Sequence, residues 1–483
     1  MRNESSHAAS FGSNRTLEKL VIFHFSLLLI FATWAFGGQA RWAREGIALW
    51  GGVGVLLFLA ICVLRKTSTD TDAPRPPLWS LLWPLGLYDL VVIVSCFNPS
   101  FVEVGPPESA SLVMTDSIAW LPSAARPALA ARELWQFNVL VLSCFNLYLT
   151  LGSRRAVRKV LFVVATNAVV LAIFGTFQKL IKAKGLWLGL VKSPNDKFFS
   201  TFIYHNHWGA FTVLCTAVCL GLLFHSFRRG GHRDFWHSPA FLGAVATFLL
   251  ALSVPLSTSR SSTLLMAGLL GGALMHFLAR IIRRRRQMRE SAILPVAVVG
   301  LVCVLALSAI GYLGRDVITQ RANLTTQQLA HIAEEDGLNS RLTLYRDTWR
   351  MAAEKPVFGW GLESYAHVFR VFNTQRAAEL WIWITFYAEA HNDWFQSLAE
   401  VGFVGTGLLL LLGLLPLLSI RWTQVGSTLP RYLLAGCALV LLYAWVEFPF
   451  ANPAVMLTFW AVFYCAIRYS ALDLQLQDEE SHR

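Results

Sequence analysis

Charged residues are scarce in this chain of 483 residues, in which Asp, Glu, Lys and Arg together make up only 14%. A soluble globular protein averages about 25% charged residues, so the scarcity excludes an ordinary soluble enzyme. Hydrophobic residues account for 55% of the chain, and the mean hydropathy is +0.50. This composition predicts a polytopic membrane protein.

Features that would indicate other chemistry are also missing. All eight cysteines fall inside apolar segments, which argues against a disulfide framework in the loops and against a Cys-based zinc site. The outer loops hold no pair of acids of the Asp-x-Asp type for a divalent ion, so we expect no metal and no other cofactor. The N-terminus lacks a signal-peptide cleavage site, so we expect the first apolar segment to remain as an anchor.

Apolar runs of the length that a helix needs to cross a bilayer, about 20 residues, recur along the chain. They lie at 20–37, 46–64, 78–98, 133–151, 157–180, 207–227, 239–257, 262–282, 292–313, 394–420, 432–448 and 453–470. We therefore predict an all-α membrane protein with about 12 transmembrane helices. Helices 1–9 would occupy residues 1–313, a periplasmic helical loop 314–390, helices 10–12 residues 391–470, and a cytoplasmic tail 471–483. The outer loop after the third span shows no regular pattern.

Basic residues give the chain a net charge of +12 and gather in the loops of one side. Such an excess in short loops marks the cytoplasmic face, which places both termini inside, as an even number of spans requires. Anionic lipid headgroups are the expected partners of this charge, and we predict no nucleic-acid partner. The residues are Arg15, Lys19, Arg65, Lys66, Arg154, Arg155, Arg158, Lys159, Arg228, Arg229, Arg233, the arginines at 283–286, Arg421 and Arg431.

Polar clusters occur where predicted spans meet the outer surface, and the densest opens the span at 394–420. Polar groups at such depth cost free energy unless they have partners or a function. We expect these clusters to share one outer site that binds the substrate; Glu447, at the end of the eleventh span, is either ion-paired or part of that site, and the sequence leaves both open. They are His205, Asn206 and His207; Arg260; Arg341 with Arg346; and Glu389, His391 and Asn392.

The residue types in these clusters predict transfer of a group from a lipid-linked pyrophosphate. The planar guanidinium of Arg260 or Arg341 gives paired, charge-assisted hydrogen bonds to phosphate. His391 is the best candidate for a general base, because a helix N-terminus disfavours the imidazolium form. Either Glu389 or Glu447 could orient its ring. Such a reaction needs charge neutralisation and a base, because the leaving group is already good.

Two other stretches face the same predicted side. Five lysines, at 179, 182, 184, 192 and 197, lie in an outer loop, against the positive-inside tendency. They could bind an anionic ligand, or their side chains could reach lipid phosphates at the membrane surface; the sequence leaves both open. Within 314–390, the spacing predicts a helix from Asn339 to about Ala353 and a second amphipathic helix from Leu362 to about Phe372.

At these residues the chain resembles the O-antigen ligase and O-antigen polymerase superfamily of lipid-linked polysaccharide glycosyltransferases. The resemblance spans roughly 195–470, in order. The matching pieces are Tyr204-His205-Asn206-His207, Ser257-Thr258-Ser259-Arg260, Ser340-Arg341 followed by Trp349, Pro356-Val357-Phe358-Gly359-Trp360-Gly361, and His391-Asn392 with Gln396, Leu398, Glu400, Gly402 and Gly405.

The resemblance implies a fold of the glycosyltransferase C type and metal-independent, inverting transfer at the periplasmic face of the bacterial inner membrane. The donor would be a glycan on undecaprenyl pyrophosphate, bound by Arg260 and Arg341, and His391 would deprotonate the acceptor hydroxyl. Ligases of this superfamily often carry a further histidine two positions before the histidine of the His-Asn pair. Glu389 stands there in this chain.

That departure leaves several functions open. The first is a ligase that moves the glycan to lipid A core. A polymerase, or a ligase that acts on another acceptor such as a protein, is the alternative within the superfamily. A transporter or flippase would place ionisable groups at mid-membrane in two related halves, whereas here few occur, such as Asp89 and His24. A zinc hydrolase that uses His205, His207 and His391 would require a nearby carboxylate motif.

Overall fold

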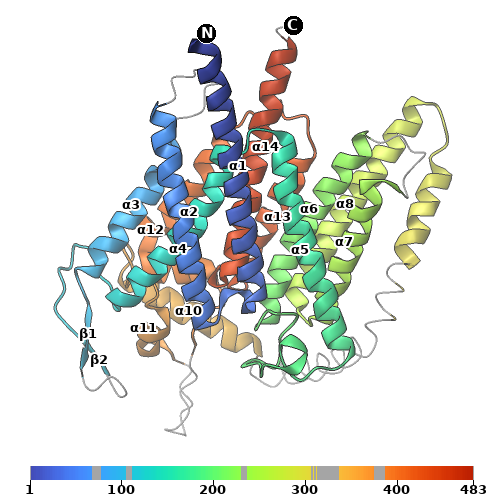
Figure 1. The fold of residues 1–483 in the computed structure, drawn as a ribbon. Helices are drawn as coiled ribbons and strands as arrows, with labels where there is room; N and C mark the ends of the chain where they lie inside the picture. The colour runs from blue at the N-terminus through green and yellow to red at the C-terminus, as the bar shows by residue number, and fades with distance from the viewer. Residues whose placement is uncertain are drawn as a thin grey trace.

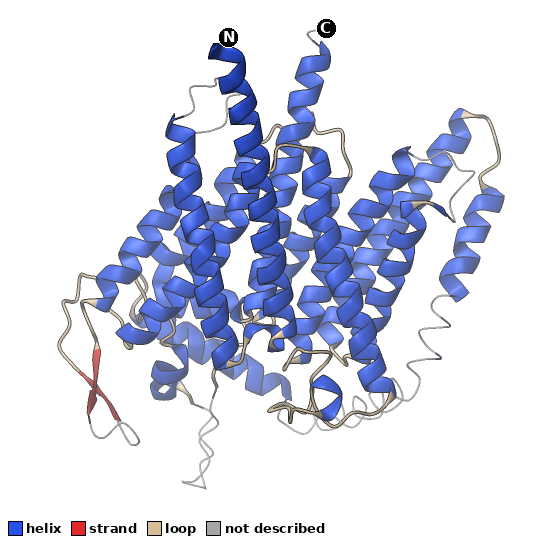
Figure 2. Cartoon of the chain, viewed as in Figure 1, coloured by secondary structure: helices blue, strands red, loops and turns tan. Residues whose placement is uncertain are grey.

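The computed structural model describes residues 2–67, 78–104, 111–229, 237–305, 308, 312, 337–374 and 387–481. These residues form a helical bundle with one small hairpin (Figures 1 and 2). The helices are α1 (Arg2–Trp34), α2 (Arg41–Thr67), α3 (Leu78–Cys96), α4 (Pro127–Thr150), α5 (Arg154–Leu180), α6 (His205–Arg229), α7 (Pro239–Leu256), α8 (Arg260–Gln287), α10 (Gly337–Glu354), α11 (Tyr365–Phe372), α12 (Asp393–Leu418), α13 (Leu429–Tyr443) and α14 (Pro453–Ser481), with short 3-10 turns at Phe36–Gly38, Trp187–Gly189 and Pro449–Ala451.

The predicted all-α polytopic class is confirmed. Eight of the described helices are long and apolar enough to cross a membrane, and three shorter apolar helices lie at Ser80–Cys96, Ile293–Leu305 and Leu429–Tyr443. A helix overlaps each of the predicted spans. The span at 133–151 corresponds to α4, which is in neither of these two groups. The total of twelve spans stays a prediction, as do the domain boundaries.

The loop after the third span is more regular than the sequence indicated. It contains β1 (Phe101–Val104) and β2 (Ser111–Met114), which pair antiparallel with Val102 opposite Val113. The expectation of an irregular loop was wrong for these residues. The β-branched valines favour a pleated strand, but the segments are too short for their alternation to stand out.

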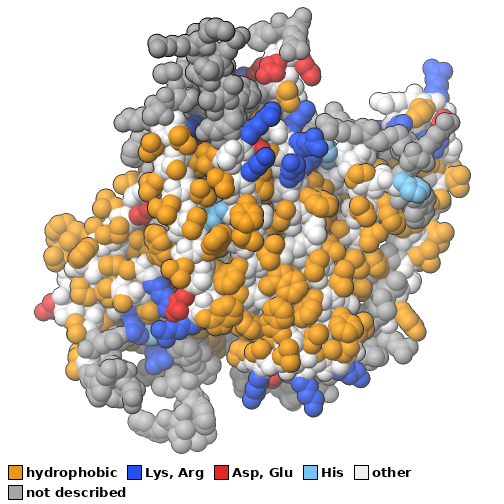
Figure 3. All heavy atoms as spheres, viewed as in Figure 1, with side chains coloured by type: hydrophobic (Ala, Val, Ile, Leu, Met, Phe, Trp, Pro, Cys, Tyr) orange, Lys and Arg blue, Asp and Glu red, His pale blue; other side chains and the backbone are white. Residues whose placement is uncertain are grey.

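The bundle has two distinct ends. Both chain termini lie at one end, and α10 and α11 lie at the other (Figure 1). Apolar side chains cover the middle of the face shown in Figure 3, and basic side chains lie above and below them. This distribution matches a protein whose middle faces lipid and whose ends face water.

The interior of the bundle is built around α14 and α6. In their most apolar windows 89% and 78% of the residues are buried, against 17% in α8, which lies at the periphery. Small residues allow close helix contact in a membrane; a Cβ on Gly436 of α13 would lie 2.6 Å from Ala217 Cβ of α6. The ends of these central helices therefore have fixed positions, and the polar clusters lie on those ends.

A break in α12 connects the membrane bundle to the α10–α11 segment. Gly402 has φ of 64°, in the left-handed region that favours glycine, and interrupts the helix. The segment 356–361 fills the break: the Trp360 N–H donates to the Ala399 carbonyl (2.9 Å). Gly359 also has a positive φ, and a Cβ there would lie 2.4 Å from the Glu400 carbonyl carbon. These glycines are therefore required by backbone packing.

Candidate active site

The carboxylate of Glu447 is the centre of the candidate site. The sequence predicted a span at 432–448 that would include Glu447. In the structure α13 ends at Tyr443, so Glu447 lies in the loop after that helix. The residue is 2% exposed. Arg341 Nη2 donates to its Oε1 (3.1 Å), while His391 Nδ1 and the Tyr204 hydroxyl each lie 3.4 Å from its Oε2. Residues from α10 and from the segments before α6 and α12 thus meet at one carboxylate.

The charge state of Glu447 follows from these contacts. Burial by itself raises the pKa of this carboxyl group. The hydrogen bond and charge of His391, together with the charge of Arg341, outweigh burial, so the net pKa is below its ordinary value. Glu447 is therefore an ionised group at neutral pH, able to hold a histidine ring and a guanidinium in place.

His391 is held in a strained backbone conformation beside this carboxylate. Its φ of 51° is uncommon for a residue with a side chain and marks a functional constraint when the surroundings enforce it. The Tyr345 hydroxyl donates to the His391 carbonyl (3.0 Å), and the ring meets the Phe448 ring edge-on at 4.7 Å. The side chain is 29% exposed. Its backbone is fixed while its ring remains accessible to a substrate.

The start of α12 is tied to the loop after α13. Asn392 caps the helix, because its Oδ1 accepts from the Phe395 N–H (3.0 Å), and its Nδ2 donates to the Trp445 carbonyl (2.9 Å). The Asp393 N–H donates to the Ala444 carbonyl (2.9 Å). Both polar groups of the Asn392 side chain thus make hydrogen bonds that position the start of α12, and its role in substrate binding stays a prediction.

The cluster before α6 forms a second wall of the site. The Tyr204 ring stacks on Phe448 at 5.4 Å, and Asn206 Nδ2 donates to the Tyr204 hydroxyl (2.8 Å). His207 Nε2 lies 3.2 Å from the Phe448 carbonyl, and His205 Nδ1 lies 3.0 Å from the Ser257 carbonyl. These predicted residues therefore do reach the site, and the two histidines orient its loops through backbone carbonyls.

Arg260 is at the same end of the bundle. It is the first residue of α8 and its side chain is exposed. The first turn of α8 is bonded to the site through the Ser262 hydroxyl, which donates to the Tyr443 hydroxyl (3.1 Å) at the end of α13. The predicted arrangement of a guanidinium at a helix N-terminus is therefore present, and such a terminus favours anions.

Two predicted residues have their contacts elsewhere. Arg346 Nη2 donates to Thr374 Oγ1 (3.4 Å), and its Nε lies 3.7 Å from Asp347 Oδ1. Glu389 accepts from Gln396 Nε2 (2.7 Å). Glu389 and Glu447 were both predicted as possible partners of His391. In the structure Glu447 contacts the His391 ring, whereas Glu389 is hydrogen-bonded to Gln396 of α12.

Two tyrosines complete the site, although neither was predicted to take part in the chemistry. Tyr345 supports the backbone of His391, and Tyr204 contacts Glu447. Tyr345 lies one helical turn after Arg341, so it shares that helix face. That spacing is the signal in the sequence that points to Tyr345, although an aromatic ring at helical spacing also fits an apolar helix face.

Glu389 belongs to a group of carboxyls with Glu363, which is half-buried as Glu389 is, and Glu400, which is buried. Burial, followed by the charge of Glu363, raises the pKa of Glu389 from 4.5 to about 7. Burial likewise raises the pKa of Glu363 to about 7. The Glu363 and Tyr365 N–H groups donate to the Glu400 carboxylate (3.2 and 3.1 Å). This group links the turn before α11 to α12.

A pH-dependent stability follows from the Glu389 pKa. The folded protein holds this proton more tightly than the unfolded chain, so the contribution of Glu389 to stability is fully present below about pH 4.5 and is lost as the pH rises through about 7. Glu389→Gln removes this loss. We expect its thermal midpoint to exceed that of the wild type by about 2 °C or more at pH 8, with no gain at pH 4.5. Thermal unfolding in detergent, with Glu354→Gln at an exposed carboxyl as the control, measures this; equal gains at both pH values would contradict it.

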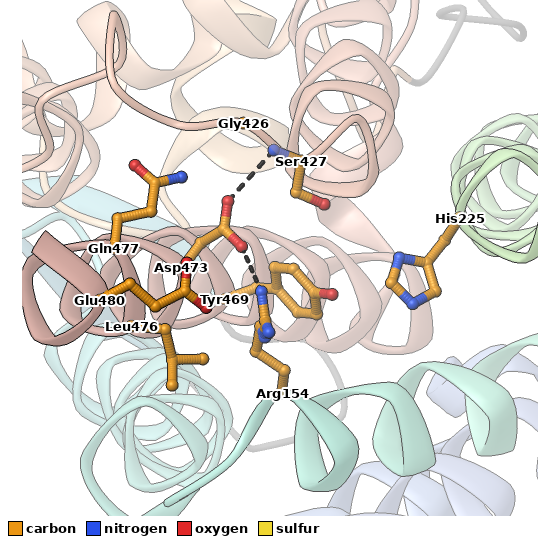
Figure 4. A pocket seen from close by; sticks show the side chains of 9 residues that line it. All are labelled: Arg154, His225, Gly426, Ser427, Tyr469, Asp473, Leu476, Gln477 and Glu480. Carbon is orange, nitrogen blue, oxygen red and sulfur yellow. Dashed lines mark hydrogen bonds and ion pairs between the residues drawn. The ribbon is translucent and has the colours of Figure 1, made fainter. Parts of the chain in front are cut away.

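A cavity at the opposite end of the bundle contains none of the predicted site residues (Figure 4). Its lining includes the ion pair of Arg154 Nη1 with Asp473 Oδ1 (2.5 Å). The Ser427 N–H donates to the other oxygen of Asp473 (3.1 Å). One carboxylate thus fastens α5 and the loop before α13 to α14, which stabilises that end of the bundle.

The fold and the site define a multi-pass membrane protein with a histidine–carboxylate–arginine cluster at one end of its bundle. A family model described as O-Antigen ligase matches residues 245–410. The chain therefore carries a domain of the O-antigen ligase superfamily, which confirms the resemblance, and its function is of the O-antigen ligase or polymerase type. The matched segment includes Arg260, Arg341 and His391, while Tyr204 and Glu447 lie outside it. No curated protein matches the chain.

Proposed function

We propose that this protein transfers a glycan from undecaprenyl pyrophosphate to a hydroxyl of lipid A core, at the periplasmic face of the bacterial inner membrane. The observation that carries the proposal is the contact of one buried carboxylate with both His391 and Arg341. This contact supports the proposal because it brings the candidate base and the candidate phosphate-binding cation together. Transfer from a lipid-linked pyrophosphate needs these two functions together.

In the proposed reaction His391 is the general base. A carboxylate that accepts from Nδ1–H leaves Nε2 with its lone pair, so Glu447 fixes the useful tautomer. Nε2 takes the proton of the acceptor hydroxyl as its oxygen bonds to the anomeric carbon of the donor sugar. The bond from that carbon to the pyrophosphate oxygen breaks from the opposite side, so the configuration inverts, and Arg341 and Arg260 neutralise the charge that leaves.

In the proposed reaction guanidinium groups take the place of a metal ion. Among the residues that the structure describes, no group of three or more His, Cys, Asp or Glu side chains is arranged to hold a metal ion. His205 and His207 point ring nitrogens at backbone carbonyls. Guanidinium groups can perform the charge neutralisation that a divalent ion supplies in other transferases.

The side of the membrane that the site faces is inferred from the two ends of the bundle. Both chain termini, the start of α5 with Arg154 and the end of α8 with the arginines at 283–286 belong to one end, and the site belongs to the other (Figure 1). The positive-inside tendency then directs the site towards the periplasm.

Glu389 is the reason to keep a polymerase or a protein–glycan ligase as the alternative. It bonds to Gln396 and not to His391, so it does not replace the additional histidine of many ligases beside the base.

Deletion of the gene, followed by gel analysis of lipopolysaccharide, tests the proposed function. We expect every glycan-bearing band to disappear and the lipid-linked donor to accumulate, with restoration by the wild-type gene but not by His391→Ala. A single capped repeat would indicate a polymerase instead. Unchanged lipopolysaccharide would contradict the choice of acceptor and indicate another polymer or a protein.

A further inference from the structure

The segment 179–197, here named the lysine loop, joins α5 to the turn at 199–202 that precedes α6. It lies at the active-site end of the bundle. Its five lysines and one aspartate give it a formal charge of +4. The side chains of Lys182, Lys184, Lys192 and Lys197 are exposed. None of these four ammonium groups has a carboxylate partner among the residues that the structure describes.

The same loop exposes large apolar side chains next to its lysines. Leu190 is 87% exposed, and Leu180, Ile181, Leu188 and Val191 are between 40% and 62% exposed. Exposed leucine and isoleucine beside lysine are typical of a surface that inserts between lipid chains while the ammonium groups meet phosphates. The composition of the loop therefore fits an anionic lipid better than a soluble anion.

The lysine loop is an ordered platform. The Trp187 ring packs against those of Trp34 (5.5 Å) and Phe174 (5.7 Å). Gln178 Oε1 accepts from the Leu188 N–H (3.0 Å), and Gln178 Nε2 donates to the Ser200 carbonyl (3.1 Å). The lysines are therefore presented from a defined backbone that is packed on α1 and α5.

The platform continues directly into the active site. The His205 N–H donates to the Lys197 carbonyl (2.9 Å), and the adjacent Tyr204 reaches Glu447. A lipid held on the lysine loop would thus lie beside the wall formed by Tyr204 and His205. An ordinary phospholipid has no need of that position, whereas an acceptor must bring a hydroxyl to His391.

We propose that the lysine loop docks the phosphorylated membrane anchor of the acceptor glycolipid. The proposal rests on the proposed transfer function and assigns the anionic acceptor to this loop, while the donor pyrophosphate belongs to Arg341 and Arg260. Charge attraction brings the anchor to the loop, and the apolar side chains hold its lipid chains at the depth of the site.

The test uses the full-length protein in nanodiscs of zwitterionic lipid, with the four substitutions Lys182→Gln, Lys184→Gln, Lys192→Gln and Lys197→Gln combined. We expect the KM for phosphorylated lipid A core to rise about tenfold or more, with kcat and the KM for the donor unchanged. Removal of the phosphates from the acceptor should raise the KM of the wild type for the acceptor by a similar factor. In the lysine variant the same removal should change the KM little. The matched control replaces the four arginines at 283–286 with glutamine and should leave the KM unchanged.

An equal rise in KM for phosphorylated and dephosphorylated acceptor, reversed by added anionic phospholipid, would overturn the proposal and assign the loop to leaflet lipid. A direct binding measurement separates this proposal from the transfer function. If the wild type transfers nothing, retention of phosphorylated lipid A core by the wild type but not by the lysine variant still supports docking. Equal retention by both proteins overturns it.

Discussion

Replacement of His391 by alanine is expected to lower the rate of glycan transfer by roughly 10²–10⁴, the contribution typical of a positioned general base. The acceptor hydroxyl would lose the group that takes its proton, while Arg341 and Arg260 would still bind the donor. The measurement is the initial rate of transfer in nanodiscs, with thermal stability measured in parallel. We expect the decrease to appear in kcat, with the KM for the donor little changed.

His391→Asn is the matched variant for this prediction. Asparagine tolerates the left-handed backbone that residue 391 adopts, with φ of 51°, but it supplies no base. It should lose transfer as alanine does while it keeps the Tyr345 hydrogen bond to the backbone carbonyl. Wild-type transfer by either variant would disprove the assignment of His391 as the base.

Replacement of Arg341 by alanine should reduce transfer by roughly 10²–10³, because one donor to a developing negative charge is lost. The change also removes one of the two cations that hold the pKa of Glu447 below its ordinary value. We therefore expect the pH at which transfer is half-maximal to rise. Initial rates from below pH 4.5 up to about pH 9 measure both effects.

Two further variants separate the functions of Arg341. Arg341→Lys keeps the positive charge beside Glu447 but loses the planar fork that binds phosphate in a paired manner. It should restore the wild-type pH dependence and only part of the rate. Glu447→Gln should impair His391 while donor binding persists. Full activity in Arg341→Lys would show that charge alone is required. Full activity in Arg341→Ala would disprove a role for this residue in transfer.

The sequence was informative about helices and about which polar clusters meet. Apolar run length depends on bilayer thickness, so the helices that hold the site could be placed before the structure was known. His391 could likewise be placed at the entry of α12, which begins at Asp393. The convergence of His205, Arg341 and His391 at one end followed from topology, because alternate loops of a bundle share a face.

Partner choice within the site could not be predicted. Glu389 is only two residues from His391, whereas Glu447 is 56 residues away and nevertheless makes the contact. The left-handed backbone at His391 and the Gln396 bond to Glu389 determine which carboxylate faces the ring. Both depend on tertiary packing, which helical periodicity and residue spacing do not reveal. For the same reason Asn392, which has the residue type of a ligand, is a helix cap.

The direct test of the account is reconstitution of the reaction. The purified protein in nanodiscs would receive a glycan on undecaprenyl pyrophosphate together with lipid A core, in the presence of a chelator of divalent ions. We expect the glycan to join lipid A core with inverted anomeric configuration, and undecaprenyl pyrophosphate to be released in equal amount. Transfer that stops in the chelator and resumes with a divalent metal, or a glycan that leaves undecaprenyl pyrophosphate only to extend another lipid-linked glycan, would contradict it.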